Sequence, residues 1–129
     1  MKSLLLLITI FLSGCASNYT SIDQVRQSQP QKTVSVALPL ETSYENVLIQ
    51  VSECFTANVY KVVSFKRDKS AEVSILAAAA TTGSNVWLSL KFDEVSPTET
   101  KVSLFWGNSN WESHAEKAIK WASGDKTKC

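Results

Sequence analysis

The sequence predicts an α+β domain, in which an antiparallel sheet of about five strands carries two helices on one face, in the order β-α-β-β-β-β-α. Two patterns lead to this prediction. Apolar residues alternate with polar ones in five segments, which is typical of half-buried strands, and they recur at helical spacing in two others. Because the last four strand segments are separated by short turns, we expect them to form an antiparallel meander.

The first strand and the first helix are expected in the region that opens the domain. Apolar and polar residues alternate over residues 33–38, and Pro39 ends this pattern. A helix is expected from Thr42, because Glu45 lies three residues later and completes a capping box. Cys54 lies beside the apolar stripe of this helix, where it is well placed to join the helix to a neighbouring element. The stripe comprises Tyr44, Val47, Leu48, Val51 and Phe55.

The four strands of the meander are expected at about residues 59–66, 72–77, 86–92 and 101–106, with turns at residues 66–70, 81–85 and 95–98. The run Ala77–Ala80 alone favours a helix. Its place between a strand pattern and a turn signal predicts a strand end instead. The side chains expected to face the core from the last three strands are Val73, Ile75, Ala77, Val86, Leu88, Leu90, Phe92, Val102, Leu104 and Trp106.

A second helix is expected at the end of the chain. Ser109 and Glu112 form another capping box, and Gly124 ends a helical pattern that starts near Asn110. Its inner stripe comprises Trp111, Ala115, Ala118, Ile119 and Ala122. The complete order of elements resembles helix-grip or TATA-binding-protein-like folds, and distantly the helix-grip domains of an accessory lipoprotein of the outer-membrane β-barrel assembly machine.

Residues 1–15 have the pattern of a cleaved secretory leader. Lys2 supplies a positive charge, and an apolar run covers residues 4–12. Such a run spans only about 14 Å as a helix, whereas a bilayer core is about 30 Å thick, so a leader is a better interpretation than a transmembrane helix. The segment Leu12-Ser13-Gly14-Cys15 resembles the lipobox of bacterial lipoproteins.

This resemblance implies that Cys15 is linked through its sulfur to diacylglycerol, that residues 1–14 are removed, and that the new amino terminus is acylated. An ordinary secretory leader followed by a chance cysteine is the alternative. Ala16 stands where an aspartate often retains Gram-negative lipoproteins at the inner membrane, which implies the periplasmic side of the outer membrane. We therefore divide the chain into a leader (1–14), a lipidated flexible tether (15–32) and one α+β domain (33–129).

Charge and cysteine content restrict the possible partners. Without Lys2 the chain has 12 basic and 12 acidic side chains, because the full sequence has 13 and 12. Nucleic acid is therefore not expected as a partner, since binding it requires clustered lysine and arginine. If Cys15 carries lipid, Cys54 and Cys129 remain to form a disulfide in an oxidising compartment. Two free thiols are the alternative.

One candidate binding surface is expected on the sheet face opposite the helices. Trp87 and Phe105 alternate with core positions of neighbouring strands, and Lys91 and Lys101 flank them. Exposed aromatic patches of this kind often mark surfaces for protein or glycan partners. The alternatives are a cross-strand pair that only stabilises the sheet, or a surface covered by the tether.

Catalytic patterns are weak in this sequence. His114 and Cys54 could form a nucleophile pair, but a disulfide at Cys54 would consume the thiol. We expect no cofactor and no metal site, because one histidine with Glu112 and Glu116 is a poor ligand set. We therefore expect a non-enzymatic envelope lipoprotein that binds membrane lipid through acylated Cys15 and an envelope protein or cell-wall component through its sheet. A small thiol- or histidine-dependent enzyme and a periplasmic inhibitor or immunity-type protein are the alternatives.

Overall fold

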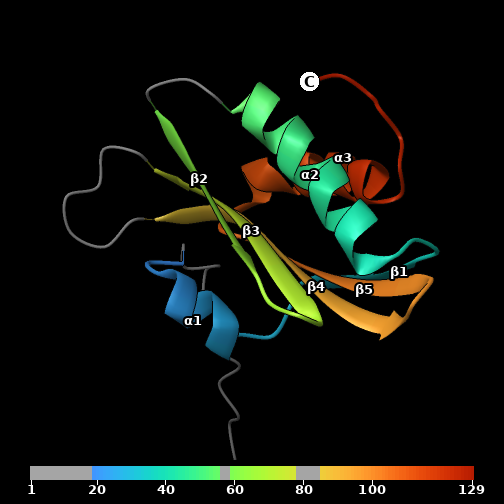
Figure 1. Ribbon diagram of the computed structural model, residues 1–129. Coiled ribbons are helices and arrows are strands. Elements are labelled where there is room, and N and C mark those ends of the chain that lie inside the picture. Colours follow the sequence, from blue (N-terminus) through green and yellow to red (C-terminus); the bar gives the residue numbers. More distant parts are fainter. Residues whose placement is uncertain (1–18, 56–58, 78–84) are drawn as a thin grey trace, which may run out of the picture.

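A computed structural model describes residues 19–55, 59–77 and 85–129. These residues form one open, antiparallel, five-stranded sheet with helices packed against it (Figure 1), which confirms the predicted fold class. The elements are α1 (Ile22–Gln27), β1 (Lys32–Val36), α2 (Leu40–Cys54), β2 (Tyr60–Lys66), β3 (Ser70–Ala77), β4 (Val86–Ser96), β5 (Glu99–Trp106), the single 3₁₀ turn η1 (Ser109–Trp111) and α3 (Glu112–Ala122).

The sheet has the order β1-β5-β4-β3-β2, so the last four strands form the predicted meander and β1 lies beside β5. The β2–β3 turn is closed by a hydrogen bond of 2.7 Å from Arg67 N to Ser70 O. Residues 78–84 lie outside the described part, so the predicted strand end over Ala77–Ala80 is described only at Ala77. This topology leaves β1 and β2 as the two edges of the sheet.

The main core lies between the sheet and the two longer helices. Apolar side chains of α2 and α3 meet those of β3, β4 and β5, and small alanines bring α3 close to the sheet. Ser43 also joins the two helices, because its buried hydroxyl donates a hydrogen bond of 2.9 Å to Ala122 O. The residues of this core with least solvent exposure are Val47, Val51, Ala71, Val73, Ile75, Leu88, Leu90, Phe92, Val102, Leu104, Ala115, Ala118, Trp121 and Ala122.

Both predicted capping boxes are wrong. Helix α2 begins at Leu40, two residues before Thr42, and its N-cap Pro39 makes no side-chain hydrogen bond. The earlier start is explained by Leu40, because its side chain belongs to the core and the added turn buries it. Before α3, Asn108 rather than Ser109 caps the chain by accepting a hydrogen bond of 3.0 Å from Asn110 N.

The predicted end of the last helix at Gly124 is confirmed. Gly124 has a φ of +94°, which glycine adopts without steric strain. Its N–H donates to Trp121 O at 3.0 Å, and Asp125 N donates to Lys120 O at 2.9 Å. These two bonds form a Schellman motif, which satisfies carbonyls of the last helical turn.

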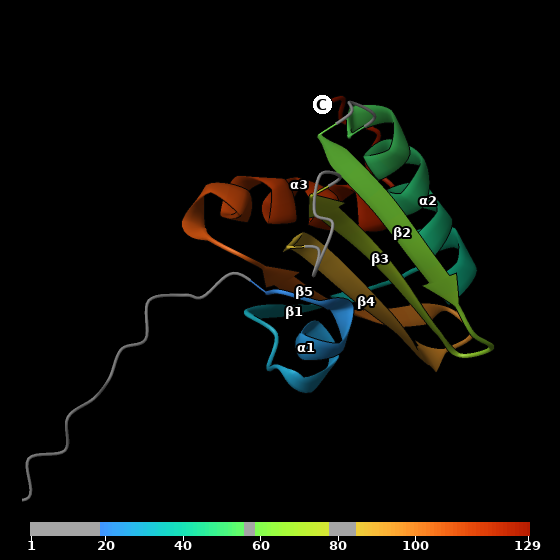
Figure 2. The same ribbon diagram turned by 90° about the vertical axis from the view of Figure 1, so that its left-hand side faces the viewer.

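The prediction of a flexible tether over residues 15–32 is wrong for residues 19–32. Figure 2 shows that α1 lies on the face of the sheet opposite α2 and α3. Val25 of α1 is only 3% exposed and packs with Leu76, Val86 and Phe105. Upstream of α1, Tyr19 O accepts a hydrogen bond of 2.8 Å from Val86 N. This segment is therefore part of the folded body and covers part of the second sheet face.

A β-bulge at the start of β4 changes the direction of its first side chains. Ile75 pairs with Leu88, whereas Leu76 pairs with Val86, so Trp87 is an extra residue in β4. An extra residue reverses the faces to which the preceding side chains point. Val86 was expected to share the core with Leu88, but it packs instead beside α1, and that expectation is wrong.

Candidate binding site

The predicted aromatic patch of Trp87 and Phe105 does not exist. Trp87 lies on the helix side of the sheet, where its ring stacks on Trp111 with a centroid distance of 5.9 Å and an interplanar angle of 10°. Phe105 points to the other face but is only 5% exposed, because Val25 covers it and Tyr19 packs edge-on against it at 6.3 Å. The bulge and α1 therefore separate and bury the two rings.

The other two residues of the predicted surface do lie together. Lys91 and Lys101 line a hollow of about 300 Å³ between α1 and the outer face of the sheet. Phe105 forms part of its wall. The remaining lining residues include Ile22, Arg26, Pro30, Thr33, Glu72, Ser89, Asp93 and Ser103. The outer face thus offers a polar hollow where the sequence suggested an aromatic patch.

The strand register explains how the charges of this hollow come together. Lys91 pairs with Glu72 on one side and with Ser103 on the other. One row further along, Asp93 pairs with Lys101. Because cross-strand partners point to the same face, charges of both signs from three strands meet at the floor of one site.

The cations of the hollow differ in how strongly they are paired. Arg26 donates to both oxygens of Glu72, with Nε–Oε1 at 3.0 Å and Nη2–Oε2 at 2.8 Å. Hydrogen bonding to Glu72 raises the pKa of Arg26 above its usual value. Lys91 Nζ lies 3.8 Å from Asp93 Oδ1, which is a loose contact. Within the described ranges Lys101 makes no ion pair. Lys101 is therefore the cation most available to an acidic ligand group.

Hydroxyl groups complete the floor of the hollow. Ser89 lines the hollow, and its Oγ shares a hydrogen bond of 2.8 Å with the Oγ of Ser74, a buried residue of β3. Ser103 lines the hollow beside them, and Thr33 lies exposed at its rim. Hydroxyl and ammonium groups in a partly enclosed site can bind a polar ligand through several hydrogen bonds.

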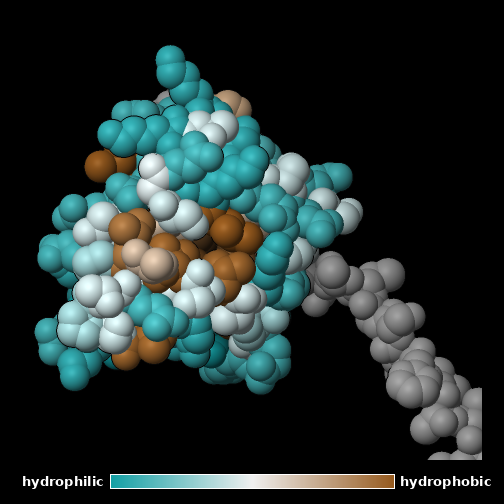
Figure 3. Space-filling view, turned by 90° about the vertical axis from the view of Figure 1, so that its right-hand side faces the viewer, coloured by the Kyte–Doolittle hydropathy of each residue, from teal (hydrophilic) through white to brown (hydrophobic). Residues whose placement is uncertain are grey.

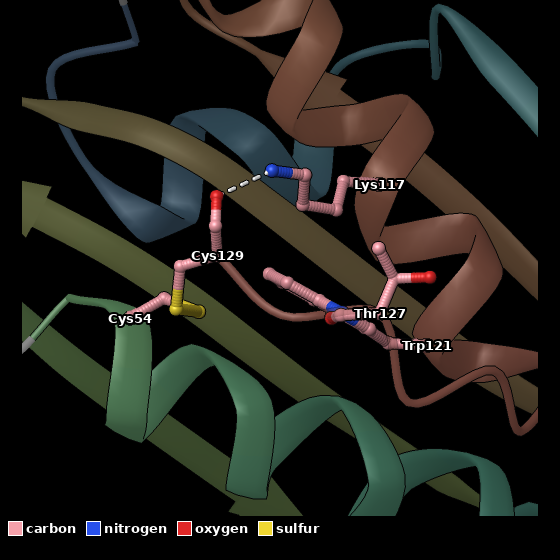
Figure 4. The surroundings of a disulfide bond; sticks show 5 residues. All are labelled: Cys54, Lys117, Trp121, Thr127 and Cys129. Carbon is pink, nitrogen blue, oxygen red and sulfur yellow. Dashed lines mark hydrogen bonds between the residues drawn. A yellow bond between two sulfur atoms is a disulfide. The ribbon is translucent and has the colours of Figure 1, made fainter.

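The disulfide between Cys54 and Cys129 agrees with the predicted pairing. It joins the end of α2 to the chain terminus across 75 residues, with a Cα–Cα distance of 5.5 Å. Figure 4 shows that the terminal segment is also held by α3. Lys117 Nζ donates to Cys129 O at 2.8 Å, and Trp121 Nε1 donates to Thr127 O at 2.7 Å. The disulfide and these two hydrogen bonds therefore hold α2, α3 and the C-terminal segment together at one end of the helical layer.

His114 does not meet a thiol. It packs against the rings of Phe55 and Trp111, with centroid distances of 5.4 and 4.8 Å. Partial burial, with a smaller contribution from Lys117, lowers the pKa of His114 below its usual value of 6.5. Because Cys54 is bonded to Cys129, the Cys54–His114 pair lacks the thiolate that nucleophilic catalysis requires.

An apolar patch appears on another side of the molecule. Figure 3 shows apolar side chains inside a border of polar ones, on the side where α3 and the edge strand β1 lie. Partly buried apolar residues of this region are Val34, Leu38 and Ile119, and all three pack against the main core. The patch is thus the place where the core reaches the surface beside an edge strand.

Comparison with known proteins places the chain in no family. No protein-family model matches it, and no curated protein matches it. Within residues 19–55, 59–77 and 85–129, no helix is long and apolar enough to cross a membrane. In the same residues no three His, Cys, Asp or Glu side chains are grouped so that they could hold a metal ion. The polar hollow and the disulfide are therefore the described features from which we propose a function.

Proposed function

We propose that this chain is a lipid-anchored protein of the bacterial cell envelope, attached through Cys15, whose folded body binds another envelope component and catalyses no reaction. The observation that carries the proposal is the Cys54–Cys129 disulfide. The sequence has three cysteines, so this bond leaves Cys15, which directly follows Leu12-Ser13-Gly14. A disulfide also supports an oxidising compartment outside the cytoplasm. The absence of aspartate at position 16 favours the periplasmic side of the outer membrane.

The binding role is supported by the chemistry of the polar hollow. Lys101 is unpaired among the described residues, and Ser103 and Thr33 supply hydroxyl groups beside it. These groups suit a partner with carboxylate, phosphate or several hydroxyl groups, such as an acidic peptide segment or a cell-wall component. The enzyme alternative is less well supported because Cys54 is oxidised.

The lipid anchor is tested by metabolic labelling with an alkyne-bearing fatty acid, followed by membrane fractionation. The native chain should take up the label and sediment with membranes, whereas Cys15→Ser should remain unlabelled. Cys54→Ser is the matched control, because it removes one sulfur of the disulfide and leaves Cys15 intact, so this variant should keep the label. A native chain that stays unlabelled, or label that survives in Cys15→Ser, would contradict the anchor.

The binding role is tested with a photo-crosslinking residue placed at Thr33, on the rim of the hollow. We expect a discrete crosslinked partner in cells, and Lys101→Ala should reduce its yield. The same crosslinker at Ser52, an exposed position of α2 on the opposite face of the sheet, is the control position. Equal products from both positions, or a Thr33 product insensitive to Lys101→Ala, would exclude the hollow as the binding site.

A further inference from the structure

The two ends of the sheet carry different kinds of side chain. At one end, where β2 and β4 begin and β3 and β5 finish, lie Val59, Tyr60, Trp87, Trp106 and Trp111, which we call the aromatic end. Val59 is 63% exposed, and Tyr60, Trp87 and Trp106 are half-buried. The opposite end, the charged end, holds the turn Lys66-Arg67-Asp68-Lys69, in which all four side chains are exposed, together with the exposed apolar residues Phe65 and Val95.

The aromatic end is a packed cluster and not a set of separate side chains. Trp111, almost buried, stacks on Trp87, and Tyr60 meets Trp111 edge-on with a centroid distance of 5.8 Å. Three of the four tryptophans of the sequence belong to this end. Tryptophan and tyrosine rings favour the interface between lipid and water, because each combines an apolar ring with a polar group.

The described chain also begins at the aromatic end. Tyr19 O accepts from Val86 N, next to Trp87 in β4. The hydroxyl of Tyr19 donates to Gln31 Oε1 at 3.2 Å, and Gln31 Nε2 donates to Trp106 O at 2.6 Å. Tyr19 is therefore fixed beside two of the tryptophans.

The distance from this point to the proposed anchor is short. Four residue steps separate Cys15 from Tyr19, and extended chain spans at most about 14 Å over that length. The headgroup layer on each side of a bilayer is about 5–8 Å thick, from the difference between the whole bilayer and its hydrocarbon core. A lipid on Cys15 therefore holds Tyr19 and its neighbours close to the membrane surface.

We propose that the aromatic end rests on the lipid surface, with the charged end directed away from the membrane. This inference rests on the lipid anchor proposed above. Helix α1 lies nearby, but its exposed residues Asp23, Gln24, Arg26 and Gln27 are polar, and its buried Val25 packs on the sheet. The polar hollow lies between the two ends, on the outer face of the sheet, so it stays open to a partner while the body rests on lipid.

Tryptophan quenching in vesicles tests this arrangement. The purified, lipid-bearing protein is reconstituted into phosphatidylethanolamine–phosphatidylglycerol vesicles with brominated acyl chains, which quench nearby indole rings. A Gly/Ser spacer of about ten residues after Ser17 adds roughly 16–19 Å of mean reach and gives a matched control with all four tryptophans. We expect strong quenching of the native chain and loss of most of it in the spacer form.

Single substitutions identify the rings that contact lipid. Trp87→Phe and Trp106→Phe should each reduce the quenched fraction, whereas Trp121→Phe should not reduce it, because Trp121 is 1% exposed in the core and contributes emission that lipid does not quench. Equal quenching of the native and spacer forms, or a quenched fraction lost only with Trp121, would overturn the proposal. The spacer comparison needs no core substitution, so it remains decisive if a Trp87 variant fails to fold.

The result of the quenching test can be distinguished from the result of the test for a lipid on Cys15. Mass spectrometry of the same preparation reports whether Cys15 carries lipid. If it does not, the proposed function fails, and coupling a maleimide phospholipid to the Cys15 thiol still places the chain on vesicles. Quenching of the coupled chain would support the docking surface, and its absence would overturn it.

Discussion

Removal of the disulfide should have a large effect on stability. The bond closes a loop across 75 residues. In the loop-entropy treatment, a loop of this length lowers the free energy of folding by about 4.5 kcal/mol at room temperature, through restriction of the unfolded chain. Small domains have a total free energy of unfolding of about 5–15 kcal/mol. The double substitution Cys54→Ser/Cys129→Ser should therefore remove at least about a third of it.

Urea unfolding, followed by tryptophan fluorescence and far-ultraviolet circular dichroism, measures this effect. The midpoint should fall by about 2–4 M in the double variant, and the m-value should rise because the unfolded chain becomes less compact. Lys117→Ala is the control, since it removes the hydrogen bond to Cys129 O and keeps the disulfide. A double variant within about 1 kcal/mol of the native chain would refute the loop-entropy reasoning.

Three other outcomes follow from single contacts. Val25→Asp should release α1 from the sheet, so hydrogen exchange should show loss of protection in α1 but not in β5, whereas Gln27→Glu, at an exposed position of α1, should change neither. Ser43→Ala should cost about 1–3 kcal/mol in urea unfolding, because Ala122 O loses its buried donor; no change would mean that the donor is dispensable. The folded pKa of His114 lies below 6.5, so the unfolded chain binds the proton first as the pH falls through that value. The free energy of unfolding should therefore decline in that range, and His114→Gln should flatten the decline.

The sequence predicted the strands and the two longer helices because their apolar periodicity reflects burial in one core. Val73 and Ile75 in β3 and Val102 and Leu104 in β5 face the core as the alternation indicated. A prediction from alternation assumes, however, that each residue of a strand pairs with one residue of the neighbouring strand. The bulge at Trp87 breaks that assumption. No local pattern in the sequence marked this extra residue.

Helix α1 was missed for a different reason. It has six residues, of which Val25 is the one deeply buried, and a helix this short is stable only when it docks. A signal was nevertheless present, because Ser21 and Gln24 have capping-box spacing and Gln24 N donates to Ser21 Oγ at 3.1 Å. Composition, which is polar in this segment, favoured a tether instead.

Only part of the candidate site could be predicted from the sequence. Lys91 and Lys101 could be assigned to the outer face from strand parity alone, and both line the hollow. Arg26 and Glu72 could not be connected from sequence, since their contact depends on where α1 docks. The cysteine pairing was predictable because only two cysteines remain once Cys15 is set aside for lipid.

The most direct test of the proposed envelope anchor is intact mass spectrometry of the native protein extracted from membranes. The account predicts a chain that begins at Cys15, with one intact disulfide and the added mass of a diacylglyceryl group and an amide-linked acyl chain. A chain that retains residues 1–14, or one that begins at an unmodified Cys15, would contradict it.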